Sequence, residues 1–351
     1  MRIGIIGLIN HDTIFMAGGR QVQDLGGILY NTTVMADLVE DGDRVYPISR
    51  IGAECYDAMR AMLDPRPAVN TRGIALSPRG TSRNQIRYDE AMEKVEQLTN
   101  HIDPIPLEQI EPFLDLDALL VNFIVGDDIT LETMEAIRGS ASGLLYLDVH
   151  NLCLGIDAEG YRRRRAPEDW RRWIEMFDVV QMNEVEARLL AGAGADAGND
   201  AGNDAGVNAG NETGANAGNQ AVAASNGPLE NEAVAASSGP LEAEDDFVAF
   251  GRSITALGPS VCITTRGALG PVTVYREDDI IKSVVIPSEP VREVVDTTGC
   301  GDAFAAGFVT EYLVSKDPAR ATRLANRVAS VNCTVAGLPE RGTFASERRE
   351  L

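Results

Sequence analysis

Short apolar runs alternate with helix-like runs along most of the 351 residues, and this alternation limits the folds open to the chain. The apolar runs have the length of buried strands, and the runs between them have helical periodicity or small apolar residues. Alternation of this kind favours a mostly parallel central sheet with helices on both faces, an α/β fold that binds ligands at the carboxyl ends of its strands. The predicted strands are 2–8, 44–50, 118–125, 143–149, 178–182, 260–265, 271–275 and 280–287, and the predicted helices include 31–41, 129–139, 167–177, 247–258 and 303–314.

The segment DTTGCGDAFAAGF, residues 296–308, joins a predicted strand and its approach loop to a predicted buried helix. Gly299 and Gly301 lack a Cβ, so the backbone can turn tightly there and a ligand can approach the amides closely. The free N–H groups of a first helical turn favour a bound anion such as phosphate. Asp302 stands beside them, where a carboxylate repels phosphate but can accept a proton from an attacking hydroxyl. The segment therefore indicates phosphoryl transfer, with a helix cap as the other role open to Asp302.

Several classes of protein are disfavoured by what the sequence lacks. The N-terminal run has no GxGxxG spacing, which argues against a dinucleotide-dependent oxidoreductase, and the absence of a Walker A string excludes the P-loop kinases. The five cysteines include no CxxC pair, so neither a zinc site nor a disulfide framework is expected. No apolar run is long enough for a signal peptide or a membrane span. The sequence predicts a soluble protein of a reduced cytoplasm.

Acidic residues outnumber basic ones by 53 to 31, which gives a formal net charge of −22. Such a surface repels nucleic acid and anionic lipid, so neither is an expected partner. Self-repulsion of this size is tolerable where salt screens it, since the Debye length is about 3 Å at 1 M salt. A halophilic host with a salt-rich cytoplasm explains the charge, and an ordinary acidic protein is the alternative.

We expect the thermal stability and the activity of the protein to rise when KCl is raised from dilute buffer to molar concentration. The added ions screen the repulsion between surface carboxylates. Thermal unfolding and turnover across a KCl series check this, and an optimum in dilute buffer would exclude adaptation to salt.

The segment 296–308 resembles the second signature of the ribokinase/PfkB carbohydrate kinase family, usually DTTGAGD followed by a small-residue helix. The resemblance covers nearly the whole chain, because further stretches match other family motifs in the family's order. It implies a single ribokinase-like domain over 1–351, with a small β lid from parts of 12–30 and 69–90. The matching stretches are GLINHDT (7–13), GGILYN (26–31), MNEVEARLL (182–190), TTRGALG (264–270) and ANRVASVNCTVAG (325–337).

The resemblance also implies roles for individual residues. Asp302 would be the catalytic base, and the amides of Gly299, Cys300 and Gly301 would form the anion hole. Asn183 and Glu186 would act through water on the Mg²⁺ of ATP. The residues expected to hold the substrate are Asn10, Asp12, Gly26, Gly27, Asn31 and Asn122; those expected to contact the nucleotide are Thr265, Gly267 and Asn326; and those expected to hold K⁺ are Asp296, Thr298, Asn332, Val335 and Gly337.

Some of these residues have structural alternatives. Asn183 with Glu186 can form a capped helix start, and Asp296 can be a turn residue bonded to local amides. His150, which with Asp148 is expected to line the cleft, can be a structural hydrogen-bonder. Cys300 replaces the usual Ala of the signature, and its thiol is expected to be reactive if exposed, because a helix N-terminus lowers a cysteine pKa.

The implied activity is transfer of the γ-phosphoryl group of ATP to a hydroxyl of a sugar or sugar-like small molecule. A nucleoside or vitamin-precursor kinase and a catalytically silent sugar or nucleotide sensor are the alternatives. Family lids often pair two subunits, so a homodimer is expected.

Residues 191–246 depart from the family pattern: they are acidic and rich in Gly, Asn and Ala, without aromatic or basic residues. This composition predicts a disordered insertion, because it cannot bury enough apolar surface to offset chain entropy.

Overall fold

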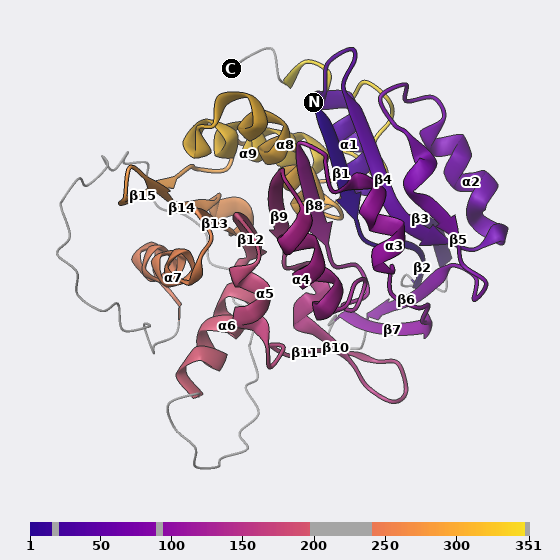
Figure 1. Ribbon diagram of the computed structural model, residues 1–351, viewed down its shortest axis with the longest axis horizontal. Helices are drawn as coiled ribbons and strands as arrows, with labels where there is room; N and C mark the ends of the chain where they lie inside the picture. Colours follow the sequence, from indigo (N-terminus) through magenta and orange to yellow (C-terminus); the bar gives the residue numbers. More distant parts are fainter. Residues whose placement is uncertain (16–20, 89–93, 197–240, 348–351) are drawn as a thin grey trace.

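A computed structural model describes residues 1–15, 21–88, 94–196 and 241–347 of the chain. Nine strands form one large sheet in the order β15-β14-β13-β12-β9-β8-β1-β4-β5 (Figure 1). Neighbouring strands are parallel except in the pairs β13–β14 and β14–β15. The predicted mostly parallel α/β sheet is therefore confirmed. The strand bounds are β1 Arg2–Ile6, β4 Arg44–Ile51, β5 Ile74–Leu76, β8 Ala118–Asn122, β9 Leu144–Asp148, β12 Val179–Asn183, β13 Val261–Thr265, β14 Val272–Glu277 and β15 Ile280–Val285.

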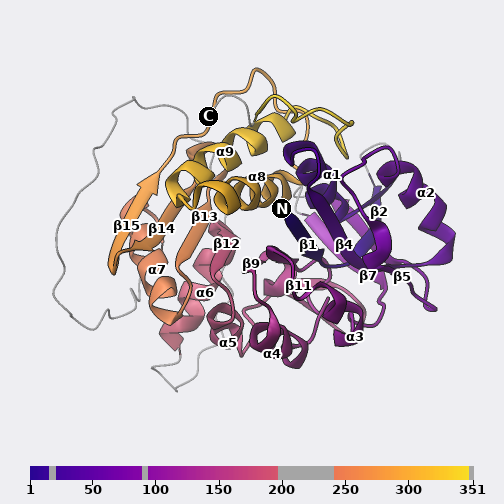
Figure 2. The same ribbon diagram turned by 45° about the horizontal axis from the view of Figure 1, so that its top comes forward.

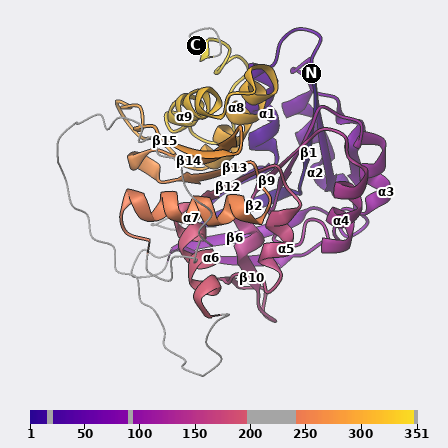
Figure 3. The same ribbon diagram turned by 60° about the vertical axis from the view of Figure 1, so that its left-hand side comes forward.

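Helices cover both faces of the large sheet. Figure 2 and Figure 3 show α1, α8 and α9 on one face and α4, α5, α6 and α7 on the other. This arrangement buries both faces of the central strands, which explains their nearly continuous apolar sequences. The helix bounds are α1 Leu29–Leu38, α2 Ala53–Leu63, α3 Leu107–Ile110, α4 Leu131–Ser140, α5 Trp170–Glu175, α6 Glu184–Asp196, α7 Glu244–Leu257, α8 Cys300–Ser315 and α9 Pro318–Asn332.

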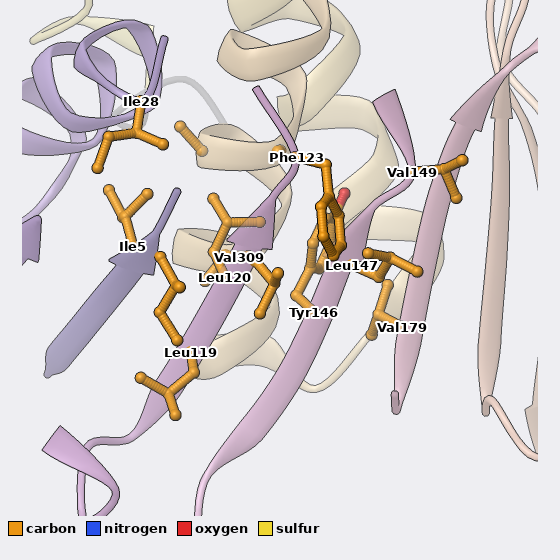
Figure 4. Packing of buried hydrophobic residues seen from close by; sticks show 14 of the residues in the cluster. Ile5, Ile28, Leu119, Leu120, Phe123, Tyr146, Leu147, Val149, Val179 and Val309 are labelled. Atoms are coloured by element: carbon orange, nitrogen blue, oxygen red, sulfur yellow. The ribbon is translucent and has the colours of Figure 1, made fainter. Parts of the chain in front are cut away.

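Helix α8 is buried from Asp302 to Glu311, as its small and apolar sequence predicts. A Cβ on Gly307 would lie only 2.9 Å from the Cα of Ala325, so this glycine lets α9 pack closely against α8. On its other side α8 faces the sheet core, where Val309 packs near side chains of β1, β8, β9 and β12 (Figure 4). The first turn of α8 is thus held rigidly above the strands.

A second sheet has the strand order β3-β2-β6-β7. Strand β2 follows the carboxyl end of β1 directly, so the second sheet lies at the carboxyl edge of the large sheet. The expected lid segments supply β2, β3 and β6, but β5, which falls within 69–90, pairs with β4 in the large sheet instead. The strand bounds are β2 Ile9–Phe15, β3 Gln21–Gly27, β6 Ser82–Tyr88 and β7 Lys94–Asn100.

The predicted insertion 191–246 is helical at both ends. Helix α6 continues to Asp196 and α7 starts at Glu244, where Asp246 accepts the backbone N–H groups of Glu242 and Ala243. A carboxylate at that position is a normal helix-start signal. Residues 197–240 lie outside the described part of the chain. Among the helices that the structure describes, none combines the length and the apolar run needed to cross a bilayer.

Candidate active site

Polar side chains from three adjacent strands meet at the carboxyl edge of the large sheet. Asn122 ends β8, Asp148 ends β9, and Gln181 lies near the end of β12. All three are buried, at 0%, 5% and 2% exposure. Parallel strands end at the same edge, so residues far apart in sequence converge below the first turn of α8.

Asp302 lies in that first turn and is 7% exposed. Its Oδ1 accepts an N–H from Nδ2 of Asn122 at 2.5 Å, and its backbone oxygen accepts from Nδ2 of Asn31 at 3.0 Å. Burial raises the pKa of Asp302 to about 6, against the lowering effect of the hydrogen bond from Asn122. The helix cap is Gly299, so the capping alternative does not apply to Asp302. At neutral pH this buried group is an ionised carboxylate that can accept a proton.

Asn31 and Asn122 form a buried network around Asp302. Nδ2 of Asn122 also donates to Oδ1 of Asn31 at 2.8 Å, and Nδ1 of His150 lies 3.0 Å from Oδ1 of Asn122. Both asparagines have 0% exposure. Their side-chain amides bond to groups of the protein, next to the proposed base, and their expected contact with substrate stays a prediction.

The turn before α8 has a backbone that only glycine adopts easily. Gly299 has φ of 75°, and a Cβ there would lie 2.3 Å from Cδ1 of Tyr30. The carbonyl of Gly301 accepts an N–H from Gln181 at 3.0 Å, and the same amide nitrogen lies 3.1 Å from Oδ2 of Asp148. Tyr30 and Gln181 thus support the turn from two sides. Sequence reasoning missed both: Tyr30 lies within the matched stretch 26–31 but was given no role there, and Gln181 lies just before the stretch 182–190.

Tyr30 also connects the turn to the second sheet. A Cβ on Gly26 would lie 3.3 Å from the Tyr30 ring and 3.2 Å from Oδ2 of Asp12. Nδ2 of Asn10 donates to Oδ1 of Asp12 at 2.6 Å. The stretches 7–13, 26–31 and 296–308 therefore meet in space, as the resemblance implies. A Cβ on Gly27 would lie 2.2 Å from the carbonyl oxygen of Leu8, so only glycine fits at the second position of the Gly26–Gly27 pair.

The residues expected to contact a nucleotide lie on adjoining elements. Thr265 ends β13 and pairs in register with Asn183 at the end of β12. A Cβ on Gly270 would lie 2.0 Å from the carbonyl of Ile286, so this glycine shapes the loop that also contains Gly267. Asn326 on α9 donates to the carbonyl of Pro287 at 2.9 Å, on the same approach segment.

Asn183 and Glu186 have the geometry of a helix start. Oδ1 of Asn183 accepts the backbone N–H of Val185 at 2.9 Å and of Glu186 at 3.0 Å, while Glu186 accepts the Asn183 N–H at 2.9 Å. This reciprocal arrangement is a capping box, the structural alternative for these residues. Burial raises the pKa of Glu186 to about 8, although the hydrogen bonds from Asn183 lower it.

The Asp296 side chain is bonded to local amides, the alternative expected for this residue. It accepts from the backbone N–H of Thr298 at 2.8 Å and of Gly337 at 3.4 Å. Burial raises its pKa, but these hydrogen bonds outweigh burial and leave the pKa lowered. Asn332 donates to the carbonyl of Thr298 at 2.9 Å, and its Oδ1 is buried with no hydrogen-bond partner among the described residues.

The surroundings of Cys300 oppose the reactivity expected from its position at a helix start. Burial, with the neighbouring Cys333 side chain, raises the pKa of Cys300 well above its usual value. Its Sγ lies 2.8 Å from Sγ of Cys333, which follows α9. The 33-residue separation of Cys300 and Cys333 did not indicate that their thiols meet.

Three ionisable side chains could together hold a metal ion. Single ligand atoms of Asp148, His150 and Asp302 all lie within 4.8 Å of one another. Burial raises the pKa of Asp148 strongly, and the charges of Asp302 and Glu186 raise it further. The centre of the site is therefore crowded with negative charge, which a cation would relieve.

Residues 223–340 match the model of the pfkB family carbohydrate kinases. The match covers about a third of the chain and shows similarity to the pfkB family carbohydrate kinases over that part. A nucleoside kinase from Methanothermobacter thermautotrophicus is 43% identical over 74 residues, which cover 21% of this chain and 22% of that protein. The match thus spans less than a quarter of the relative's length.

Solved structures share the fold of this chain over nearly its whole length. A pyrophosphate-dependent kinase in the ribokinase family, complexed with a pyrophosphate analogue and myo-inositol, has a TM-score of 0.68 at 17% identity and covers 99% of this chain and 100% of its own. Ribokinase from Arabidopsis thaliana, complexed with ribose and ATP, has a TM-score of 0.68 at 16% identity. The match covers 99% of this chain and 98% of the ribokinase. At these identities the likeness shows the fold alone.

Proposed function

We propose that this protein is a PfkB-family kinase that transfers the γ-phosphoryl group of ATP to a hydroxyl of a sugar or sugar-like molecule. The observation that carries the proposal is Asp302, a buried carboxylate in the first turn of α8 with a pKa of about 6. Such a group is ionised at neutral pH and still binds a proton well enough to act as a general base. It would take the proton of the acceptor hydroxyl as that oxygen attacks the phosphoryl group.

The turn before α8 would stabilise the charge that develops on the transferring group. The amides of Gly299, Cys300 and Gly301 lie at the start of a long helix, where the macrodipole favours an anion. Tyr30 and Gln181 support this turn from both sides. A preorganised turn does not need to rearrange during the reaction, which is the source of its effect on rate.

Unpaired polar atoms near the second sheet support a hydroxyl-rich acceptor. Oδ1 of Asn10, Oδ1 of Asn84, and Nε and Nη2 of Arg162 on β11 (Arg162–Arg164) are buried and have no hydrogen-bond partner among the described residues. Asn84 pairs in register with Asp12, and the Asp12 charge acts on Arg162. A buried polar atom without a partner costs about 1–3 kcal/mol. A sugar supplies both the donors and the acceptors that these atoms lack.

Mg²⁺ and K⁺ are the ions that the proposed reaction would use. Asn183 and Glu186 would hold Mg²⁺ through water, and the fit is supported by Glu186, whose carboxylate is buried with a raised pKa that a cation would lower. Bound to the nucleotide, Mg²⁺ supplies charge neutralisation of the phosphates. The oxygens of Asp296 and Thr298, with the unpaired Oδ1 of Asn332, fit a monovalent cation that prefers oxygen ligands.

A panel of acceptors tests the proposal. Ribose, myo-inositol and nucleosides are each supplied with ATP or with pyrophosphate, and ADP or phosphate release is measured. We expect turnover with ATP and at least one of these acceptors. Turnover with pyrophosphate alone would refute the donor assignment, and binding of acceptors without any turnover would favour a silent sensor.

A nucleoside is the second candidate acceptor. It is favoured by the 43% identity over 74 residues to the archaeal nucleoside kinase. Comparing kcat/KM for ribose with that for its nucleosides separates the two, because only an enzyme with room for the base will prefer the nucleoside.

A further inference from the structure

We propose that His150 is a positioning residue, which fixes the orientation of the Asn122 carboxamide and through it holds the Asp302 carboxylate. The inference rests on the proposed role of Asp302 as the base. It concerns a chain of three hydrogen-bonded side chains that come from the loop after β9, from the end of β8 and from α8.

The chemistry of these groups assigns the direction of each hydrogen bond. An ionised carboxylate only accepts, so the Asn122 atom that lies 2.5 Å from Oδ1 of Asp302 must be the amide nitrogen. The Asn122 carbonyl oxygen then faces His150, whose Nδ1 is 3.0 Å away. A carbonyl oxygen also only accepts, so Nδ1 of His150 must carry a proton. The Asp302 carboxylate thereby determines the histidine tautomer.

The same bonds show what His150 contributes. Nδ2 of Asn122 donates both of its hydrogens, one to Asp302 and the other to Oδ1 of Asn31 at 2.8 Å. On its other side, Oδ1 of Asn122 faces Nδ1 of His150. Without that donor, the carboxamide would be held from its nitrogen side alone, and its buried oxygen would lose its hydrogen bond. The amide could then shift, and the Asp302 carboxylate that it holds would be positioned less precisely.

The backbone conformation at His150 supports the view that its surroundings hold the imidazole in one position. Its φ is 37°, in the left-handed region that few residues other than glycine adopt. A strained residue persists where its surroundings hold it in place. Asparagine tolerates this region better than most residues, and its Nδ2 stands as many bonds from Cβ as Nδ1 of histidine. His150→Asn therefore keeps a donor at the required point without the imidazole.

We expect His150→Ala to lower kcat about tenfold while KM for ATP and for the acceptor stays within about twofold, because a misplaced base affects the chemical step. His150→Asn is expected to restore kcat to within about threefold of the unmodified protein. His150→Leu, which keeps bulk but has no donor, should behave as His150→Ala does and replaces it if the alanine variant unfolds. His101→Ala is the control, because His101 is exposed and bonded to Asp127 away from this network.

Three outcomes would overturn the inference. Unchanged kcat in both donor-free variants would show that Asn122 does not need His150. Failure of His150→Asn to rescue a lowered kcat would mean that the imidazole itself acts, as an acid, a base or a metal ligand. A rise in KM without a fall in kcat would make His150 a substrate contact. Failure of the proposed function is distinguishable, since Asp302→Asn would then keep its turnover whatever His150 does.

Discussion

Asp302→Asn is expected to lower kcat by about a thousandfold, because general-base catalysis typically contributes 10²–10⁴-fold to rate. The substitution keeps the shape of the side chain and leaves an oxygen that can still accept from Asn122, so the network around it should persist. The affinity for ATP, measured by calorimetry, is expected to stay near that of the unmodified protein. Thermal stability should not fall, because burial already disfavours the ionised form of Asp302.

The pH dependence of kcat provides a second measurement of the same residue. Burial raises the pKa of Asp302 to about 6, so the base is ionised above that pH and protonated below it. Turnover should therefore fall as the pH drops through about 6, and this acidic limb should be absent from the residual activity of Asp302→Asn. Asp115→Asn is the control for loss of a negative charge, because Asp115 is exposed and pairs with Arg2 at the start of β1, at the opposite end of the strands from Asp302. Near-normal activity of Asp302→Asn would show that another group is the base.

Gly299→Ala is expected to reduce both stability and turnover. The added methyl would lie 2.3 Å from Cδ1 of Tyr30, closer than any real side-chain contact, and φ of 75° strains every residue except glycine. Left-handed strain of about 1 kcal/mol and overpacking of about 1–3 kcal/mol add to a loss of roughly 3 kcal/mol in the free energy of unfolding. Displacement of Tyr30 or of the turn should lower kcat at least about tenfold, since the anion hole depends on its preformed shape.

Gly42→Ala separates the effect of left-handed backbone strain from the effect of overpacking against Tyr30. Gly42 has φ of 97°, but a Cβ there would have nothing within 4 Å. The variant should lose only the strain contribution of about 1 kcal/mol and keep full activity. Denaturant unfolding and kcat of the two variants are compared side by side. Equal effects in both would mean that contact between Gly299 and Tyr30 is unimportant.

The sequence predicted the fold class well because the deciding signals are local. Apolar runs of strand length and the small-residue run of 303–314 do not depend on distant contacts for their interpretation. The sequence specified less where tertiary pairing decides. Parts of 69–90 were expected in the lid, and within that range β5 pairs in parallel with β4 of the large sheet, because a three-residue run does not specify its partner strand. The ends of the insertion, to Asp196 and from Glu244, are helical because capping and packing extend the neighbouring helices.

The candidate site also has one part that local sequence predicted and another that depends on tertiary contacts. Residues 296–308 by themselves contain the glycine turn, the helix start and the carboxylate, because an anion hole and its adjacent base can be built from contiguous chain. The sequence thereby determined the candidate base and the class of chemistry. Only the tertiary structure decided what surrounds Asp302. Asn31, Asn122 and Asp302 are separated by 91 to 271 positions along the chain, and their hydrogen bonds exist because β8 ends where α1 and α8 begin. Directional contacts of this kind require strand order and register, which no local pattern specifies.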